Sequence, residues 1–144
     1  MVLSPTAKSA ARVRAGLVPL AAVLCASIAF AQEVSAPVKA DADGVQRITV
    51  TSGSYFFKPG RIVVKANVPV ELLASRESGI TPHNLVIQAP EAGVMVDQEL
   101  ASDPKKIAFT PTKPGKYAIY CSKKLPFMAG HREKGMEGVL EVVP

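Results

Sequence analysis

The sequence contains few of the side chains that bind transition metals. Its 144 residues include two histidines, His83 and His131, and two cysteines, Cys25 and Cys121. It also lacks internal repeats and low-complexity segments, and no stretch shows a convincing helical period. These absences argue against a helical fold and leave very few candidate ligands for a metal site.

The first 31 residues have the pattern of a secretory signal peptide. An apolar, uncharged stretch at residues 15–31 ends in Ala29-Phe30-Ala31, which is an A-x-A cleavage site before Gln32. The charges that precede this stretch are Lys8, Arg12 and Arg14. The alternative is a transmembrane anchor, but a run of about 17 residues is at the lower limit for spanning a bilayer, and Pro19 interrupts it. We therefore predict an exported protein, periplasmic in a bacterium, with no stable membrane insertion.

Cleavage would leave residues 32–144, which are 113 residues and suffice for one domain with one core. We expect residues 32–44 to form a flexible lead-in and residues 45–144 to form the domain. The mature chain would carry 14 basic and 12 acidic side chains, a formal net charge of +2. Such a small charge, spread along the chain, does not favour binding to nucleic acid.

Cleavage would also remove Cys25 and leave Cys121 as a lone cysteine. A lone cysteine in an exported protein indicates either an intermolecular disulfide or a thiol with a special role. Binding to a metal is one way to occupy such a thiol in an oxidising compartment.

Short β-type runs separated by turn residues follow one another from residue 45 to the end of the chain. The expected strands are residues 45–51, 55–57, 61–65, 68–75, 83–88, 106–110, 116–121 and 139–143. Residues 91–106 are less clear and would form a short helix or a loop, and residues 122–135 would form a loop. Seven or eight short strands in about 110 residues indicate an all-β, Greek-key β-sandwich.

Strand parity places sulfur and nitrogen side chains at strand ends with apolar neighbours. Cys121 ends one strand, His83 begins another and Met136 precedes the last, while His131 lies in the loop between Cys121 and Met136. A thiolate, two imidazoles and a thioether favour copper, in a trigonal His₂Cys site with a weak axial Met. Zinc would accept the cysteine and both histidines but rarely binds a thioether.

The segments that carry these residues together resemble a cupredoxin. "TPHNLVI", residues 81–87, resembles the strand of plastocyanins and pseudoazurins that carries the first histidine ligand. "FTPTKPGKYAIYC", residues 109–121, resembles their Pro-Gly-x-Tyr-x-x-x-Cys strand, and "FKPGRIVV", residues 57–64, resembles their second strand. "HREKGMEGVLEV", residues 131–142, matches the plastocyanin-like H-x-x-x-G-M-x-G pattern and the final strand that follows it.

The resemblance implies a site for one copper ion that cycles between Cu(I) and Cu(II). His83 and His131 would be the imidazole ligands, Cys121 the thiolate and Met136 the axial ligand. The family residue that matches Asn84 ties the ligand loops together by hydrogen bonds, so Asn84 is expected to fix the geometry of the ligands.

The loop between Cys121 and His131 departs from the family pattern. Plastocyanin-like chains have two to four residues between these ligands, whereas this chain has nine, Ser122 to Gly130. A similar spacing occurs in the type 1 site of copper nitrite reductases, but those enzymes need further histidines that this chain lacks. The dicopper site of cytochrome oxidase subunit II needs two cysteines in this loop. The longer loop also makes Met128 a rival for the axial position.

The resemblance therefore implies an exported, monomeric carrier of single electrons that is not an enzyme. An exposed edge of the His131 imidazole would pass the electron. The partners would be redox proteins such as cytochromes or oxidases, with an acidic docking surface that faces a basic rim (Lys123, Lys124, Arg132 and Lys134) around an apolar dock (Leu125 to Met128). One alternative is a periplasmic protein that delivers or buffers copper. Another is a metal-free interaction domain in which Cys121 forms an intermolecular disulfide.

Overall fold

The structure, a computed structural model, describes residues 36–144, and these residues contain nine β-strands. The predicted signal peptide lies outside the described residues. The strands are β1 (Gln46–Gly53), β2 (Phe56–Lys58), β3 (Arg61–Lys65), β4 (Val70–Arg76), β5 (His83–Ala89), β6 (Val94–Leu100), β7 (Lys105–Phe109), β8 (Gly115–Tyr120) and β9 (Glu137–Val143). One short 3-10 helix, η1 (Pro90–Ala92), precedes β6. The described residues contain no helix that is both long and apolar enough to cross a bilayer.

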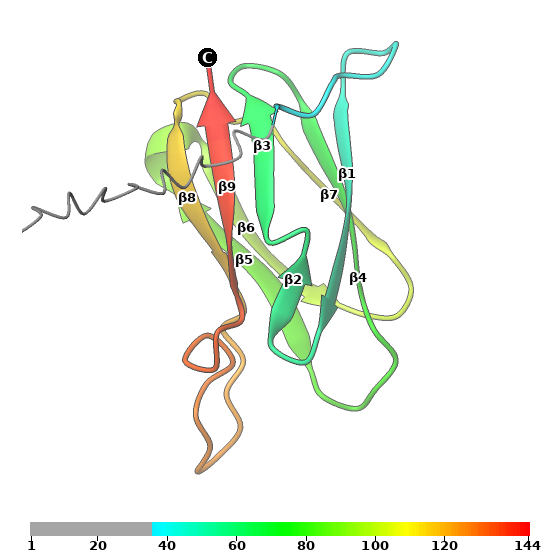
Figure 1. Ribbon diagram of the computed structural model, residues 1–144, viewed down its shortest axis with the longest axis vertical. Helices are drawn as coiled ribbons and strands as arrows, with labels where there is room; N and C mark the ends of the chain where they lie inside the picture. Colours follow the sequence, from blue (N-terminus) through cyan, green and yellow to red (C-terminus); the bar gives the residue numbers. More distant parts are fainter. Residues whose placement is uncertain (1–35) are drawn as a thin grey trace, which may run out of the picture. The chain divides into compact units, whose positions relative to one another are not determined.

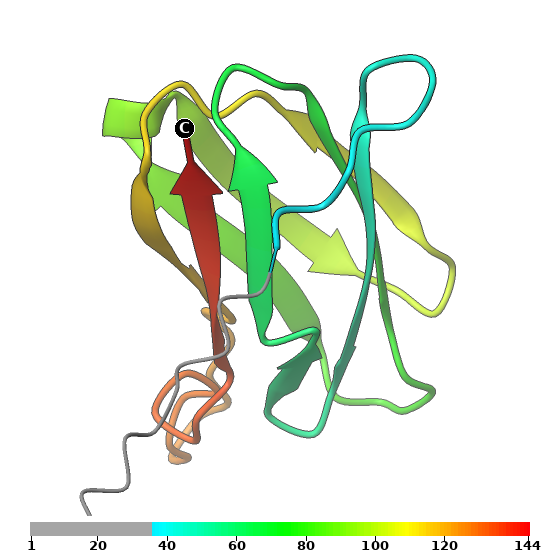
Figure 2. The same cartoon turned by 45° about the horizontal axis from the view of Figure 1, so that its top comes forward.

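The strands form two sheets that pack face to face (Figures 1 and 2). One sheet has the order β2-β1-β4-β7 and the other has the order β3-β9-β8-β5-β6. β1 pairs with β4 in parallel and β3 pairs with β9 in parallel, while the other pairings are antiparallel. The chain passes between the sheets five times, because β3, β4, β5, β7 and β8 each start in the sheet opposite the preceding strand. The prediction of an all-β sandwich is confirmed.

The core lies between the sheets and is filled by alternate residues of each strand. Completely buried aliphatic side chains come from both sheets, among them Leu72 of β4 and Leu85, Ile87, Ile119 and Leu140 of the five-stranded sheet. Burial of each such side chain contributes about 1.5–3 kcal/mol relative to leaving it in water. This packing fixes the strand ends, from which the candidate ligands project.

β6 is a strand where we expected a short helix or a loop. In the part of the chain that the structure describes, only η1 is helical. β6 pairs with β5 in seven consecutive positions, from His83 opposite Leu100 to Ala89 opposite Val94. Its ends, Val94 and Leu100, are buried, but the residues between them include Asp97, Gln98 and Glu99, which have low intrinsic strand preference. The neighbouring strand therefore determines this conformation more than the local sequence does.

Part of the expected lead-in contacts the domain. The backbone N–H of Val38 donates a hydrogen bond to the carbonyl of Val63 at 2.8 Å. The guanidinium of Arg47 in β1 forms ion pairs with Asp41 at 2.8 Å and with Asp43 at 2.7 Å. Residues 38–44 thus lie along the domain, and the boundary at residue 45 stays a prediction.

Gln46 is a buried polar residue at the start of β1 that joins the two sheets. Its side-chain oxygen accepts a hydrogen bond from the backbone N–H of Lys65 in β3 at 2.8 Å. Its side-chain nitrogen donates to the carbonyls of Lys65 and Val68, each at 3.4 Å. The amide therefore provides hydrogen-bond partners for partly buried backbone groups at the end of β3 and in the segment that follows it.

We predict that Gln46→Ala lowers the free energy of unfolding by about 1–3 kcal/mol, because it leaves these backbone groups unsatisfied. Urea unfolding followed by circular dichroism measures the change. The matched control is Gln88→Ala in β5, where the side chain is exposed and the expected change is within about 0.5 kcal/mol. Equal changes in the two variants would contradict the role of Gln46.

Candidate metal centre

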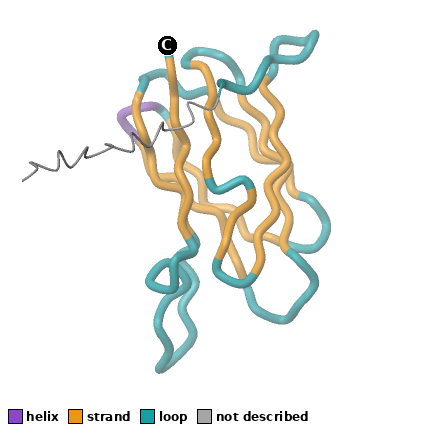
Figure 3. Tube along the Cα trace, in the orientation of Figure 1, coloured by secondary structure: helices purple, strands orange, loops and turns teal. Residues whose placement is uncertain are grey.

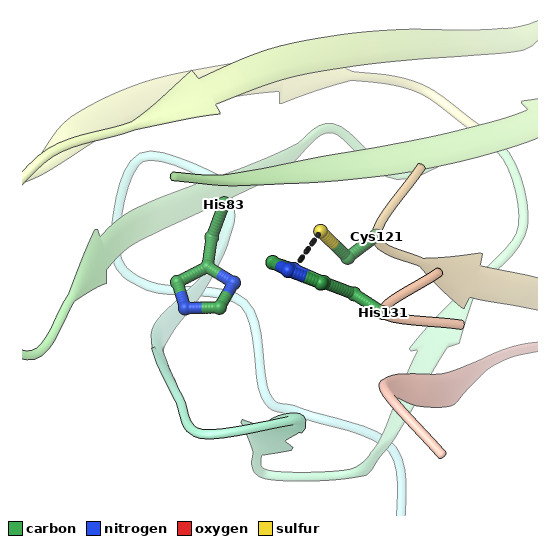
Figure 4. A group of neighbouring side chains, drawn as sticks. All are labelled: His83, Cys121 and His131. Atoms are coloured by element: carbon green, nitrogen blue, oxygen red, sulfur yellow. Dashed lines mark hydrogen bonds between the residues drawn. The ribbon is translucent and has the colours of Figure 1, made fainter. Parts of the chain in front are cut away.

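Three buried side chains from different parts of the chain converge at one end of the sandwich (Figure 4). His83 is the first residue of β5, Cys121 directly follows β8, and His131 lies in the loop between β8 and β9. One ligand atom from each residue lies within 4.8 Å of the other two. Cys121 Sγ is 3.5 Å from His131 Nδ1, and the ring centroids of His83 and His131 are 4.9 Å apart. A single metal ion could contact all three side chains.

One buried nitrogen of this cluster lacks a hydrogen-bond partner within residues 36–144, and a metal ion would supply the missing interaction. His83 Nδ1 is buried and has no hydrogen-bond partner among the described residues, although buried polar atoms nearly always have one. Cys121 is completely buried and forms no disulfide within residues 36–144. A metal ion between these residues would satisfy both the orphaned nitrogen and the thiol. A thiolate together with two imidazoles is a donor set that suits copper.

A backbone hydrogen bond separates the ligand loop into a base and an arm. The N–H of His131 donates to the carbonyl of Lys123 at 2.8 Å. Of the nine residues between Cys121 and His131, Ser122 and Lys123 precede this hydrogen bond and form the base. The other seven, residues 124–130, form an arm, and the segment between β8 and β9 extends beyond the strand ends (Figures 1 and 3).

Met136 joins the base of the loop through the backbone. The N–H of Cys121 donates to the carbonyl of Met136 at 3.2 Å, and the N–H of Met136 donates to the carbonyl of His131 at 3.0 Å. Met136 is completely buried. Met128, the rival for the axial position, is 47% exposed in the arm. Burial and backbone contacts therefore favour Met136 as the thioether nearest the cluster.

The structure requires glycine at both Gly135 and Gly138, on either side of Met136. Gly135 has a φ of 92°, a left-handed conformation that side chains rarely adopt. A Cβ on Gly138 would lie 2.8 Å from the carbonyl oxygen of Gly60, so only glycine permits this approach of β9 to the chain before β3. The Gly-Met-x-Gly pattern thus sets the path of the backbone on either side of Met136.

A comparison with known families matches residues 20–132 to the family described as the cupredoxin-like domain. The chain belongs to the cupredoxin-like family. The family and the His-Cys-His cluster together identify the cofactor as one copper ion. No curated protein matches the chain.

Solved structures share the cupredoxin fold at low sequence identity. The metal-binding domain of the Streptococcus pneumoniae D39 Cu(I)-exporting P-type ATPase CopA, determined with Cu(I), is 21% identical with a TM-score of 0.54. That match covers 76% of this chain and 97% of the other. Reduced auracyanin from Roseiflexus castenholzii is 19% identical with a TM-score of 0.55, and the match covers 74% of this chain and 100% of the other. At these identities the likeness establishes the fold alone.

Asn84 connects this cupredoxin's ligand loop to β5 and β6. Its side-chain oxygen accepts a hydrogen bond from the backbone N–H of Ser122 at 2.9 Å. Its side-chain nitrogen donates to the hydroxyl of Ser122 at 2.8 Å and to the carboxylate of Asp97 at 2.7 Å. Ser122 follows Cys121 directly, so Asn84 restrains the backbone that carries the thiol. Ser122 and Asp97 were not foreseen, because no local motif marks them and only the pairing of β5 with β6 brings Asp97 close.

The imidazole of His131 is 2% exposed, so the expectation of an exposed edge is wrong. Tyr55, for which the sequence suggested no role, contacts this imidazole edge to face, with ring centroids 5.3 Å apart. The two residues are 76 positions apart in the chain, and no motif links them. Only the folded arrangement, which places the β1–β2 turn beside the ligand loop, brings Tyr55 and His131 together.

Both histidines resist protonation. Burial, followed by the nearby charges of His131 and Arg76, lowers the pKa of His83. Burial, followed by the charge of Lys134, lowers the pKa of His131. The folded chain therefore favours neutral imidazoles, which is the form that binds a metal.

We predict that the copper-stripped protein loses stability as the pH falls below about 6.5, the ordinary pKa of histidine in an unfolded chain. Below that pH the unfolded chain binds protons that the folded chain does not, so the free energy of unfolding decreases. Urea unfolding at several pH values between about 5.5 and 7.5 measures this slope. The slope should be smaller in the His83→Gln/His131→Gln double variant, and an unchanged slope would contradict its origin in these two residues.

We predict that replacing residues 124–130 with Asn-Gly leaves the site intact. The Lys123–His131 hydrogen bond would then close a two-residue turn, for which Asn-Gly is well suited. Four residues would separate Cys121 from His131, the upper end of the plastocyanin-like range. The shortened protein should bind Cu(II) with a visible spectrum like that of the parent, measured by absorption during titration. A lost or strongly shifted spectrum would show that the arm itself shapes the ligand set.

Proposed function

We propose that this protein is an exported, monomeric cupredoxin that carries single electrons between redox proteins. His83, Cys121 and His131 would hold the copper ion, and Met136 would supply a fourth, weaker thioether ligand. Asn84 keeps Cys121 in position through its hydrogen bonds with Ser122. The observation that carries the proposal is the convergence of three buried donor side chains on one point, with a buried His83 nitrogen that lacks any other partner.

Copper bound here would supply a one-electron Cu(I)/Cu(II) couple. The chain supplies a frame that keeps the donor atoms in place in both oxidation states. The backbone of Cys121 is hydrogen-bonded to that of Met136, and the backbone of Met136 is hydrogen-bonded to that of His131, so backbone hydrogen bonds connect these three residues. A frame that limits the movement of the ligands when the copper gains or loses an electron favours an electron carrier over a catalyst. We therefore propose no enzymatic activity.

The signal-peptide pattern of residues 1–31 supports export to the periplasm. A lone thiol in that compartment is protected when it is buried and bound to a metal. Cytochromes or oxidases are the kinds of redox protein that would exchange electrons with this carrier.

The docking surface that we propose is the arm together with the cations beside it. Leu125, Phe127 and Met128 are exposed, and Phe127 is completely so. Three of the four cations already have carboxylate partners: Lys123 contacts Glu99, Lys124 lies 3.8 Å from Glu133, and Arg132 lies 2.8 Å from Glu137. An acidic partner surface is still the proposal, but these pairs reduce the net positive charge that would attract it.

We predict that Cu(II) titration of the purified protein gives one bound copper with an intense thiolate-to-copper band in the visible range and reversible one-electron voltammetry. The two methionines provide a matched pair of variants. Met136→Leu should change the reduction potential, because it removes the axial ligand, whereas Met128→Leu should leave the potential unchanged. Equal behaviour of the two variants would contradict the assignment of Met136.

Two other outcomes would favour the alternatives. Tight binding of Cu(I) without a stable Cu(II) form would indicate a protein that delivers or buffers copper, a role that the half-exposed Met128 could assist. No copper binding, with rapid alkylation of Cys121, would exclude both copper functions.

A further inference from the structure

Tyr55 has a backbone conformation that its residue type disfavours. Gly53 pairs with Phe56 across the β1–β2 hairpin, so Ser54 and Tyr55 form a two-residue turn. Tyr55 has a φ of 65°, in the left-handed region where hairpin turns usually place glycine or asparagine. A bulky residue persists in such a conformation only when its surroundings hold it there, and such strain often marks a functional position.

The unusual backbone places the tyrosine ring against a candidate copper ligand. The ring meets the His131 imidazole edge to face, with an angle of 78° between the ring planes and 5.3 Å between the centroids. Tyr55 is itself only half-buried and packs against the core, whereas His131 is buried. Tyr55 therefore lies on the outer side of a buried imidazole.

Lys134, which lies in the ligand loop, contacts the ring and the hydroxyl of Tyr55. Its Nζ donates a hydrogen bond to the Tyr55 hydroxyl at 3.0 Å and lies 4.6 Å from the centroid of the ring. Lys134 is located between His131 and Met136 in the sequence. The contact thus joins the ligand loop to the β1–β2 hairpin of the opposite sheet, across a separation of 79 residues.

We propose that Tyr55 is a positioning residue that covers His131, and that Lys134 fastens it to the ligand loop. The ring restricts the rotation of the imidazole and keeps water from its outer face. A redox partner that approaches this side would meet the tyrosine ring rather than the bare histidine edge. The inference rests on the proposed role of His131 as a copper ligand, but its test does not require copper.

The test measures how fast diethyl pyrocarbonate, a reagent for accessible neutral imidazoles, modifies each histidine in the copper-stripped full-length protein. Peptide mass spectrometry separates His131 from His83. His83 serves as an internal control because Tyr55 packs against the ring of His131, and the ring contact of His83 is with His131 instead. Tyr55→Gly removes the ring and accepts the positive φ, and Tyr55→Asn does the same if the glycine variant folds poorly. Far-UV circular dichroism verifies that each variant is folded.

We expect Tyr55→Gly to raise the modification rate of His131 by about tenfold or more, while the rate of His83 stays within about twofold of the parent. Tyr55→Phe retains the ring and its contact with the Lys134 ammonium but loses the hydrogen bond, so we expect only a small increase. Lys134→Met removes both contacts and should give a larger, intermediate increase. Phe56→Leu, an aromatic change at the neighbouring position, is the matched control and should have no effect on either histidine.

Three results would overturn the inference. The first is an unchanged modification rate of His131 in Tyr55→Gly. The second is an equal rise in the rates of both histidines, which would indicate general loosening of the structure. The third is a modification rate of His131 in Tyr55→Phe as high as that in Tyr55→Gly. A separate Cu(II) titration of the parent protein tests the proposed function. Failure to bind copper would therefore be distinguishable from failure of Tyr55 to cover the imidazole.

Discussion

The hydrogen bond from the N–H of His131 to the carbonyl of Lys123 is the constraint on which the ligand loop depends. It places His131 near Cys121, although seven residues lie between Lys123 and His131. The loop is therefore of ordinary length where it holds donor atoms and long only where it faces solvent. Without this bond, closing a flexible segment of nine residues would leave the second imidazole poorly placed, and preorganisation of the donors would be lost.

Most of the fold and the donor set could be predicted from the sequence because both depend on local patterns. Alternation of apolar residues marks β1 and β8, and a continuous apolar run marks β5. Strand parity also directs His83 and Cys121 inward. β6 was missed because its central residues are polar and its conformation depends on β5. The cover over His131 was missed for a similar reason. The contact depends on a tyrosine in a conformation that its residue type does not predict, and on the packing of a hairpin from the other sheet.

The charges around the loop are balanced where the sequence suggested an excess. Lys123, Lys124 and Arg132 each have a carboxylate nearby, and one of these carboxylates, Glu99, comes from β6, the strand that the sequence did not reveal. Exposed pairs of this kind add little stability, but they cancel much of the local field. Recognition at this end of the protein would then rest more on the shape of the arm and its exposed aromatic ring than on net charge.

The sheet order has a mechanical consequence for the metal centre. His83, Cys121 and Met136 are attached to the ends of β5, β8 and β9, which are neighbours in one sheet, and His131 lies in the connection between two of them. All four candidate ligands are thus attached to one sheet, either at a strand end or through the β8–β9 loop. A small sliding motion of one sheet over the other would alter the distances among these residues less than it would alter the contact of His131 with Tyr55, which belongs to the opposite sheet. Motion between the layers would therefore disturb the candidate metal centre less than motion within the five-stranded sheet would.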